Sequence, residues 1–366
     1  MKRLLCVLSN VNAGGAETFL MKMFRAVDRS QYCFDFCVNL EGKNYYEDEI
    51  NQLGGKVFKI PSKSEDRTQF KKQLSEIIRR EGYESVLRIT SNSFGFMDLM
   101  VAKKAGAKNC CVRSSNSSDG NSWKVKIAHK LGRLLYGKFI DVKIAPSELA
   151  AEYTFGKKSY RNGEVNILHN AVDLSVFKFD EEWRKQVRSE FGIKNQTLVV
   201  GHVGRFNLQK NHEFLIEVFN EINKRNPESI LMLVGIGDLE GKIKEKVLSL
   251  GLQDKVVFTG LRSDVPKMLC AMDVFVFPSF YEGMPNTVIE AQATGLPCII
   301  ANTITKEANI TGLVEYLSLS DSAEQWAEKT LSKSSNERKN TYDDFVENGY
   351  DIECEVKRFI GLVFGE

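Results

Sequence analysis

Two glutamates, Glu282 and Glu290, lie in a stretch whose turn-forming and apolar residues predict a loop followed by a helix. Residues 278–297 read PSFYEGMPNTVIEAQATGLP, and the apolar run before them, residues 274–277, predicts a buried strand. We expect the helix to begin near Asn286. The unpaired N–H groups and the dipole of a helix N-terminus favour an anion such as phosphate. Carboxylates beside such a site could accept hydrogen bonds from the hydroxyls of a ribose and a hexose.

The same spacing allows a purely structural interpretation. Thr287 and Glu290 match a capping box, in which the glutamate side chain only binds a backbone N–H at the start of the helix. These two residues alone do not decide between a cap and a ligand site.

Two cations follow a second predicted strand, residues 197–203. Gly204 and Arg205 come directly after this strand, and Lys210 lies five positions beyond Arg205. A guanidinium offers a planar fork of donors and an ammonium offers a point charge, so the two could clamp a diphosphate. An ordinary basic loop is the alternative.

Gly14 and Gly15 stand between a predicted strand, residues 4–8, and a predicted amphipathic helix, residues 18–27. Glycines let the backbone approach a ligand closely, and the start of the following helix would face that ligand. A tight turn without a ligand explains the two glycines equally well.

Arg113, Ser115 and Asn116 follow a predicted strand, residues 109–112. The carboxyl ends of strands line the ligand crevice of open α/β sheets, so these polar residues could orient a sugar there. The alternative is a solvated loop.

Residues 123–138, WKVKIAHKLGRLLYGK, carry five lysines or arginines and no acid. Ile127, Leu131, Leu134 and Leu135 recur at helical spacing among these cations. Such a helix suits the surface of an anionic membrane. A helix packed on the core with a solvated basic face is the alternative.

Strands and helices alternate along the whole chain, which predicts mostly parallel sheets covered by helices on both faces. In the first half, strands are expected at residues 4–8, 34–40, 57–60, 85–89, 109–112 and 142–145, and helices at 18–27, 45–53, 68–81 and 95–105. In the second half, strands are expected at 197–203, 229–234, 256–260, 274–277 and 298–301, and helices at 181–191, 212–225, 264–272, 326–331 and 342–364.

The bulk properties narrow the class of protein. A chain of 366 residues predicts two domains, and a net charge of +2 argues against a dedicated nucleic-acid binder. No apolar run approaches the roughly 20 residues that span a bilayer. Eight cysteines without a Cys-x-x-Cys pair indicate reduced thiols and a cytoplasmic protein. The four scattered histidines and these cysteines predict no metal site.

Three motifs within residues 278–297 resemble the donor-site signature of the retaining, GT-B-type glycosyltransferases of family four. They are Pro-Ser, then Glu-Gly-x-Pro, then Glu-Ala-x-Ala-x-Gly-x-Pro. Residues 14–17, Gly-Gly-Ala-Glu, resemble the first loop of this family, and residues 204–211 resemble its pyrophosphate loop. Residues 165–177 resemble its interdomain segment, with Ala171 in place of the usual glycine. The resemblance covers most of the chain and is strongest from about residue 199 to residue 301.

The resemblance implies an α/β protein of the GT-B fold, with two Rossmann-like domains that face each other across a deep interdomain cleft. Residues 1–175 would form the acceptor-binding domain and residues 176–345 the donor-binding domain, and a last helix at about 345–366 would pack back on the first domain. The implied activity is that of a retaining glycosyltransferase of bacterial exopolysaccharide or capsule biosynthesis. It would move a hexose or N-acetylhexosamine from a nucleotide-diphosphate sugar, expected to be a UDP-sugar, to a hydroxyl of a lipid-linked oligosaccharide. We expect a cytoplasmic enzyme associated with the inner face of the plasma membrane.

The resemblance also implies roles for the residues introduced above. Arg205 and Lys210 would stabilise the leaving diphosphate, so no metal or other cofactor is expected. Glu282 would contact the donor hexose as a catalytic residue, and Glu290 would accept hydrogen bonds from the ribose. The remaining donor-binding residues would be Gly14, Gly15, Gly204, Gly283, Met284, Pro285, Asn286 and Thr287.

One departure from the family pattern concerns the loop after Val112. Many members have a histidine there, near the reacting sugar, and residues 113–118 contain none. The leaving phosphate could itself take the acceptor's proton, in which case no side-chain base is needed. Two alternatives remain: a nucleotide-sugar epimerase of the same fold, and a non-catalytic partner subunit of a glycosyltransferase. The first would need other acids and bases, and the second should lack the phosphate clamp.

Overall fold

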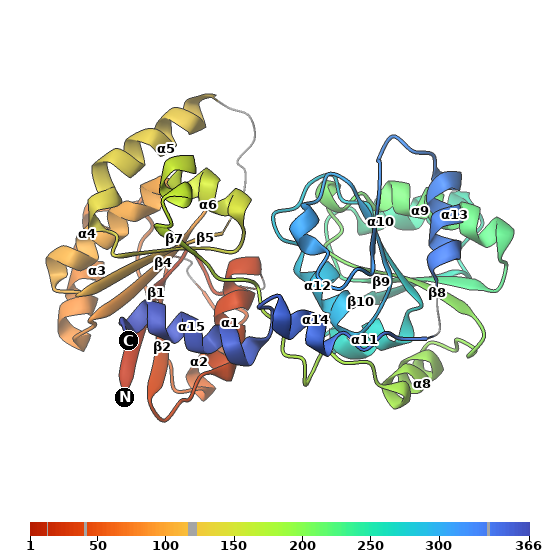
Figure 1. The fold of residues 1–366 in the computed structure, drawn as a ribbon, viewed down its shortest axis with the longest axis horizontal. Coiled ribbons are helices and arrows are strands. Elements are labelled where there is room, and N and C mark those ends of the chain that lie inside the picture. The colour runs from red at the N-terminus through yellow and green to blue at the C-terminus, as the bar shows by residue number, and fades with distance from the viewer. Residues whose placement is uncertain (13, 40–41, 116–122, 335–336) are drawn as a thin grey trace. The chain divides into compact units, whose positions relative to one another are not determined.

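The computed structural model describes the whole chain except residues 13, 40–41, 116–122 and 335–336 (Figure 1). The chain divides into two compact units. The first contains Met1–Ala171 together with Gly349–Glu366, and the second contains Val172–Asn348. The first unit is therefore made of two separate stretches of sequence, as expected for a last helix that packs back on it. The first stretch ends at Ala171, four residues before the expected boundary at residue 175.

Within the described residues, the first unit contains a seven-stranded parallel sheet in the order β3-β2-β1-β4-β5-β6-β7. Its strands are β1 (Lys2–Val7), β2 (Tyr32–Val38), β3 (Val57–Lys59), β4 (Ser85–Thr90), β5 (Asn109–Ser114), β6 (Val142–Ala145) and β7 (Val165–Ile167). Its helices are α1 (Gly15–Ala26), α2 (Glu47–Gln52), α3 (Arg67–Glu81), α4 (Phe96–Ala105), α5 (Trp123–Tyr136), α6 (Glu148–Phe155), α7 (Lys157–Arg161) and α15 (Ile352–Phe364), with short 3₁₀ turns η1 (Ser93–Gly95) and η2 (Gly137–Phe139).

The second unit contains, in its described part, a six-stranded parallel sheet in the order β10-β9-β8-β11-β12-β13. Its strands are β8 (Leu198–Val203), β9 (Ser229–Val234), β10 (Val256–Gly260), β11 (Val274–Phe277), β12 (Cys298–Ala301) and β13 (Val314–Leu317). Its helices are α8 (Glu181–Glu190), α9 (His212–Arg225), α10 (Glu240–Ser249), α11 (Val265–Ala271), α12 (Asn286–Ala293), α13 (Ala323–Lys333) and α14 (Tyr342–Glu347), with 3₁₀ turns η3 (Leu208–Lys210) and η4 (Lys306–Ala308).

Helices cover both faces of each sheet, as the alternating pattern predicts (Figure 1). In the first unit, side chains from α1, α2 and α15 form the core on one face, and side chains from α3, α4 and α6 form the core on the other. The central strands are buried over their full length, β4 and β11 among them.

The last helix belongs to the first unit. The ring of Phe359 on α15 lies 5.8 Å, centroid to centroid, from the rings of both Phe19 and Phe34. Lys2 Nζ and Glu366 Oε1 form an ion pair of 2.6 Å between the two ends of the chain. The single helix expected at residues 342–364 is wrong in one respect: it is divided into α14 and α15, because Gly349 between them has a φ of 72°, which a helix does not permit.

In both sheets the order in which strands are added reverses beside the first strand of the sheet. In the first sheet the chain builds β2 and β3 on one side of β1 and then returns to place β4 on the other side. The second sheet repeats this order, with β9 and β10 on one side of β8 and β11 on the other. Ligands of open α/β sheets bind at the carboxyl ends of the strands at such a switch point.

Candidate active site at the carboxyl ends of β8 and β11

The loops that follow β8 and β11 are joined at the switch point of the second sheet. The Phe280 N–H donates to the Gln209 carbonyl over 2.9 Å, and Gln209 Nε2 donates to the Tyr281 carbonyl over 2.8 Å. Asn211 Nδ2 donates to the Pro278 carbonyl over 3.2 Å. These contacts connect the two motifs that the sequence analysis treated separately.

Lys210 and Glu282 form the centre of this connection. Lys210 Nζ lies 2.7 Å from Glu282 Oε1, and only 17% and 9% of the two side chains are exposed. The same ammonium lies 4.6 Å from the centroid of the Phe277 ring. The structure therefore brings together the predicted lysine and the predicted glutamate as an ion pair, which the sequence analysis did not expect.

Local backbone geometry holds Lys210 in place. Asn207 Oδ1 accepts a hydrogen bond from the Lys210 N–H over 3.2 Å and begins the turn η3. Asn211, which follows, has a φ of 54° and is the one non-glycine residue with a positive φ in the described part of the chain. Asparagine tolerates this conformation better than most residues, and helix α9 starts directly after it.

Gly204 and Gly235 allow two strand ends to approach closely. A Cβ on Gly204 would lie 2.8 Å from His202 Nε2, and a Cβ on Gly235, whose φ is 139°, would lie 2.2 Å from the Gly204 carbonyl oxygen. Side chains at these positions would therefore displace the start of the loop that carries Arg205.

Arg205 is exposed, and no polar group among the described residues pairs with its guanidinium. It differs in this respect from Lys210, whose charge is already paired with Glu282. The site thus contains one unpaired cation that an anionic ligand could bind without breaking an existing ion pair.

Helix α12 begins at Asn286 as expected, but the capping-box alternative is wrong. Its N-cap is Pro285, which has no side-chain acceptor, and no side chain caps the first turn. Thr287 is therefore the second helical residue, and Glu290 lies further along the helix with 8% of its surface exposed. Gly283 and Met284 lie in the loop before the helix.

The glycine loop of the first unit lies at the carboxyl end of β1. Helix α1 begins at Gly15 with Gly14 as its N-cap, three residues before the expected start. The Glu17 carboxylate folds back against Gly14, where a side chain would collide with it, and burial raises the pKa of this carboxyl. The predicted role of the two glycines toward a donor stays a prediction.

Arg113 has its side chain inside the first unit. Its Nη2 donates to Asn170 Oδ1 over 2.6 Å, and its guanidinium carbon lies 3.6 Å from the centroid of the Phe19 ring. Burial lowers the pKa of Arg113 to about 9. Ser115 is exposed, and Asn116 lies outside the described residues. Contact of these residues with an acceptor stays a prediction, and Arg113 has a packing contact that the sequence did not reveal.

A pair of buried histidines below the Gly204 loop was missed in the sequence analysis, which regarded the four histidines as scattered. The rings of His202 and His212 have centroids 4.7 Å apart. His202 Nδ1 lies 2.9 Å from the Val276 carbonyl oxygen, and the His212 ring stacks on Phe206 with centroids 4.2 Å apart. Burial lowers the pKa of His212 to about 4 and that of His202 well below its usual value, so both rings are neutral at pH 7. Their proximity to Gly204 and Lys210 in the sequence was the available signal.

Helix α5 carries the basic and apolar residues singled out in the sequence. The exposed fractions of Ile127, Leu131, Leu134 and Leu135 are 49%, 48%, 78% and 54%. Among the residues of this helix whose burial is described, His129 and Gly132 are buried. These four side chains are therefore not core residues, although α5 packs on the body of the first unit, where Ser93 Oγ donates to the His129 carbonyl over 2.9 Å. Among the residues that the structure describes, no helix is both long enough and apolar enough to cross a membrane.

A search against protein families matches residues 184–352 to the family described as glycosyl transferases group 1. The protein named "Putative glycosyltransferase EpsF" of Bacillus subtilis (strain 168) is 33% identical over 369 residues, covering 99% of this chain and 96% of EpsF. The UDP-Gal:alpha-D-GlcNAc-diphosphoundecaprenol alpha-1,3-galactosyltransferase of Escherichia coli is 27% identical over 301 residues, covering 79% of this chain and 76% of that enzyme.

Solved structures share the fold. HepE of Anabaena, crystallised in complex with UDP and glucose, superposes with a TM-score of 0.72 at 16% sequence identity. The superposition covers 99% of this chain and 95% of HepE.

Proposed function

The chain belongs to the group 1 glycosyl transferases, and from this premise we propose that it transfers a hexose or an N-acetylhexosamine from a UDP-sugar to a hydroxyl of a lipid-linked oligosaccharide. The proposal includes retention of the anomeric configuration and a place in cell-surface polysaccharide synthesis at the inner face of the plasma membrane. The name of the Escherichia coli relative supports the donor and the lipid-linked acceptor, because that enzyme uses UDP-Gal and a diphosphoundecaprenol.

The fold is GT-B, since the two units are each a parallel sheet between helices and the chain shares its fold with HepE and with the glycosyltransferase WaaG. The observation that carries the proposed donor site is the ion pair of Lys210 and Glu282 at the switch point of the second sheet. This is the position where open α/β sheets bind nucleotides.

Cleavage of the anomeric bond leaves negative charge on a diphosphate, and the proposed site has three groups for that charge. They are the exposed guanidinium of Arg205, the ammonium of Lys210, and the N–H groups at the start of α12. Preformed donors and cations stabilise the transition state more than the ground state when charge develops beside them. The reaction then needs no metal ion in this proposal.

Glu282 has two tasks in this proposal. One carboxylate oxygen, Oε1, holds the ammonium of Lys210 at 2.7 Å. The other oxygen is available as an acceptor for a hydroxyl of the donor hexose. Glu290 would accept hydrogen bonds from the ribose, and Gly283, Met284 and Thr287 would line the donor pocket. The leaving phosphate takes the proton of the acceptor hydroxyl on the same face of the sugar.

The test is a thermal-shift panel of UDP, GDP, ADP and their sugar conjugates, measured in EDTA. A ligand that binds only the folded protein raises the melting temperature by mass action. We expect UDP to stabilise the protein without metal, and Arg205→Ala to abolish the shift while leaving the melting temperature of the unliganded protein unchanged. Lys224→Ala, on the outer surface of α9, is the matched control and should keep the shift.

Two outcomes contradict the proposal. If no nucleotide shifts the melting temperature at millimolar concentration, a non-catalytic partner subunit is the better interpretation. If UDP-sugars bind and are isomerised without an acceptor, the protein is an epimerase.

The exposed face of α5 supports contact with a membrane. Four apolar side chains lie on this helix beside exposed Lys130, which is the pattern of an interfacial helix. We place the lipid carrier of the acceptor at this surface.

A further inference from the structure

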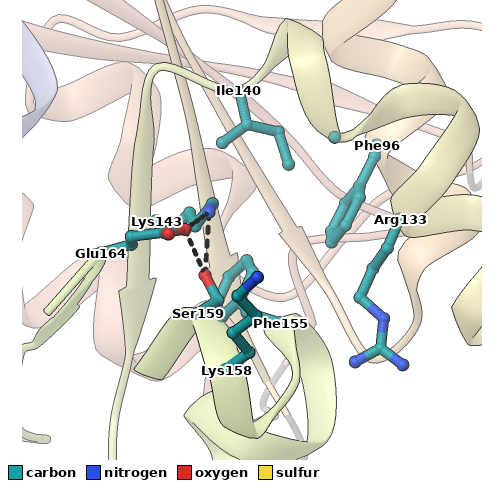
Figure 2. A pocket seen from close by; sticks show the side chains of 9 residues that line it. Phe96, Arg133, Ile140, Lys143, Phe155, Lys158, Ser159 and Glu164 are labelled. Atoms are coloured by element: carbon teal, nitrogen blue, oxygen red, sulfur yellow. Dashed lines mark hydrogen bonds and ion pairs between the residues drawn. The ribbon is translucent and has the colours of Figure 1, made fainter. Parts of the chain in front are cut away.

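A pocket of about 440 Å³ lies beside α5 in the first unit, remote in sequence from the glycine loop (Figure 2). Its floor is apolar: Phe96 and Phe155 stack with centroids 6.0 Å apart and planes 10° apart, and Ile140 completes the wall. Arg133, Lys143 and Lys158 reach it from α5, β6 and α7. An apolar floor with cations around it suits a ligand that is anionic at one end and apolar at the other.

One of the three cations is already neutralised. Lys143 Nζ donates to Glu164 Oε2 over 2.6 Å and to Ser159 Oγ over 2.8 Å (Figure 2). The hydrogen bonds from Lys143 and Ser159 lower the pKa of Glu164 to about 2, so this carboxylate stays charged at every physiological pH. The pair therefore contributes no net charge to the pocket.

The other two cations are not neutralised by the protein. Among the described residues, no carboxylate pairs with the Arg133 guanidinium or with the Lys158 ammonium. Burial lowers the pKa of Arg133, and no acid opposes this effect. The pocket thus has a net charge of +2 from Arg133 and Lys158. The Arg133 side chain is half-buried, and Lys158 is exposed.

The backbone at Gly156 is shaped around Arg133. Gly156 has a φ of 91°, and a Cβ there would lie 2.8 Å from Arg133 Nη1. A side chain at residue 156 would displace the Arg133 guanidinium. Any residue other than glycine would also be strained there, because the φ of residue 156 is positive. Gly156 at the α6–α7 junction therefore leaves room for the Arg133 guanidinium beside it.

We infer that this pocket binds the phosphate of an anionic membrane-lipid head group. The neighbouring surface favours a lipid as the source of the phosphate. Leu131, Leu134 and Leu135 share one exposed face of α5, and Arg133 lies on a different face of the same helix. A helix that buries these leucines in the interface brings head-group phosphates to the depth of its flanking cations. The inference rests on the membrane contact proposed above for α5, but it does not require the transfer reaction.

The pocket gives a membrane contact that depends on lipid charge. Full-length protein is incubated with vesicles of phosphatidylcholine alone or with one quarter phosphatidylglycerol, at constant ionic strength, and bound protein is measured by flotation. Lys130→Gln is the matched control, because Lys130 is exposed on α5 but does not line the pocket. It should lower binding to the anionic vesicles about fivefold, which is the contribution of one surface cation.

Arg133→Gln should lower that binding roughly 50-fold, because it also removes a charge-assisted hydrogen bond that accounts for roughly tenfold. Lys158→Gln should resemble Arg133→Gln, although it lies on a different helix. Equal losses in Arg133→Gln and Lys130→Gln would overturn the inference, since binding would then depend on surface charge alone.

A competition experiment separates a phosphate pocket from general attraction. Millimolar sn-glycerol 1-phosphate, at matched ionic strength, should reduce binding of the unaltered protein and of Lys130→Gln, and should leave residual binding of Arg133→Gln unchanged. Competition against all three, or against none, would contradict a phosphate site in the pocket.

Leu134→Asp tests the source of the phosphate. It should abolish binding to both kinds of vesicle and leave weak binding of glycerol 1-phosphate intact. If it leaves vesicle binding unchanged, the ligand is not a membrane lipid and the inference fails. The UDP thermal shift of the second unit is measured on every variant, so that a failed donor site is distinguished from a failed lipid pocket.

Discussion

Lys210 and Glu282 are 72 positions apart in the sequence, yet their side chains form one ion pair at 2.7 Å. The pair is largely buried, so each charge depends on the other to offset its lost hydration. Arg205 in contrast is exposed and unpaired among the described residues. At the residue scale the proposed diphosphate clamp therefore consists of two different cations. Glu282 orients Lys210, whereas the charge of Arg205 is left for a ligand to neutralise.

A double-mutant cycle tests the pair. Lys210→Ala should lower the free energy of unfolding of the second unit by about 1–3 kcal/mol, because it leaves the Glu282 carboxylate buried without its partner. Glu282→Gln combined with Lys210→Ala should recover part of this loss. The measurement is the melting temperature in the four combinations, and additive effects would show that the pair does not contribute to stability.

Activity separates these residues further. If Lys210 stabilises the leaving diphosphate, Lys210→Ala should lower kcat by about 10²–10³, as removal of one transition-state donor does in other enzymes. Lys210→Arg keeps the charge and should recover part of the rate. A change confined to KM would contradict a role in the transition state.

At the element scale, the histidine pair connects β8 with the start of α9. Both rings are buried and neutral, and burial lowers their pKa values below those in the unfolded chain. The unfolded state therefore binds more protons at acid pH, and stability present above about pH 6.5 is lost as the pH falls toward 4.

The stability of the second unit should accordingly fall below pH 6.5, with a slope of up to about 1.4 kcal/mol per pH unit for each histidine. His212→Phe should reduce this slope, because it removes one of the two groups that take up a proton on unfolding. The substitution should be tolerated, since a phenyl ring can still stack on Phe206 and neither nitrogen of His212 has a hydrogen-bond partner in the described structure. Thermal melts from pH 7 to pH 4.5 give the measurement. An unchanged slope would show that other groups take up the protons.

Element prediction succeeded where the pattern was strong. The expected helix at residues 212–225 and strand at residues 274–277 coincide with α9 and β11, because one has a regular apolar face and the other is wholly apolar. Helix α10 was missed, since only Ile243 and Val247 of its ten residues are buried and its other positions are mostly charged.

At the scale of the whole molecule, the first unit depends on the end of the chain. Phe359 of α15 is fully buried between Phe19 and Phe34, which lie more than 300 residues earlier. The first unit therefore cannot complete its core until the second unit has been synthesised. The first unit depends on the second only in the order of synthesis, because residues 349–366 follow the second unit in the sequence.

Phe359→Ala should destabilise the first unit by about 3–5 kcal/mol, the usual cost of deleting a buried phenylalanine side chain. Calorimetry with and without UDP assigns the transitions, because the nucleotide should raise only that of the second unit. Val346→Ala, on α14 and 38% exposed, is the control and should change neither transition by more than about 0.5 kcal/mol. A loss in the UDP-sensitive transition would contradict the assignment of α15 to the first unit.

Sequence alone determined the class of fold, most of the strands, and the motifs of the proposed donor site. Alternating apolar runs and helical faces are local properties, and the spacing in residues 278–297 is local as well, so both are readable along the chain. The family membership follows from the same motifs and from 33% identity to EpsF over nearly the whole chain.

Only the tertiary structure decided which separate segments meet. It paired Lys210 with Glu282, placed His202 against His212, buried Arg113 against Phe19, and made the pocket beside α5 from residues of four helices and a strand. It also excluded the capping box at Thr287 and Glu290, because the helix begins one residue after Pro285. These outcomes depend on strand order and on side-chain packing, which bring together residues that no local pattern relates.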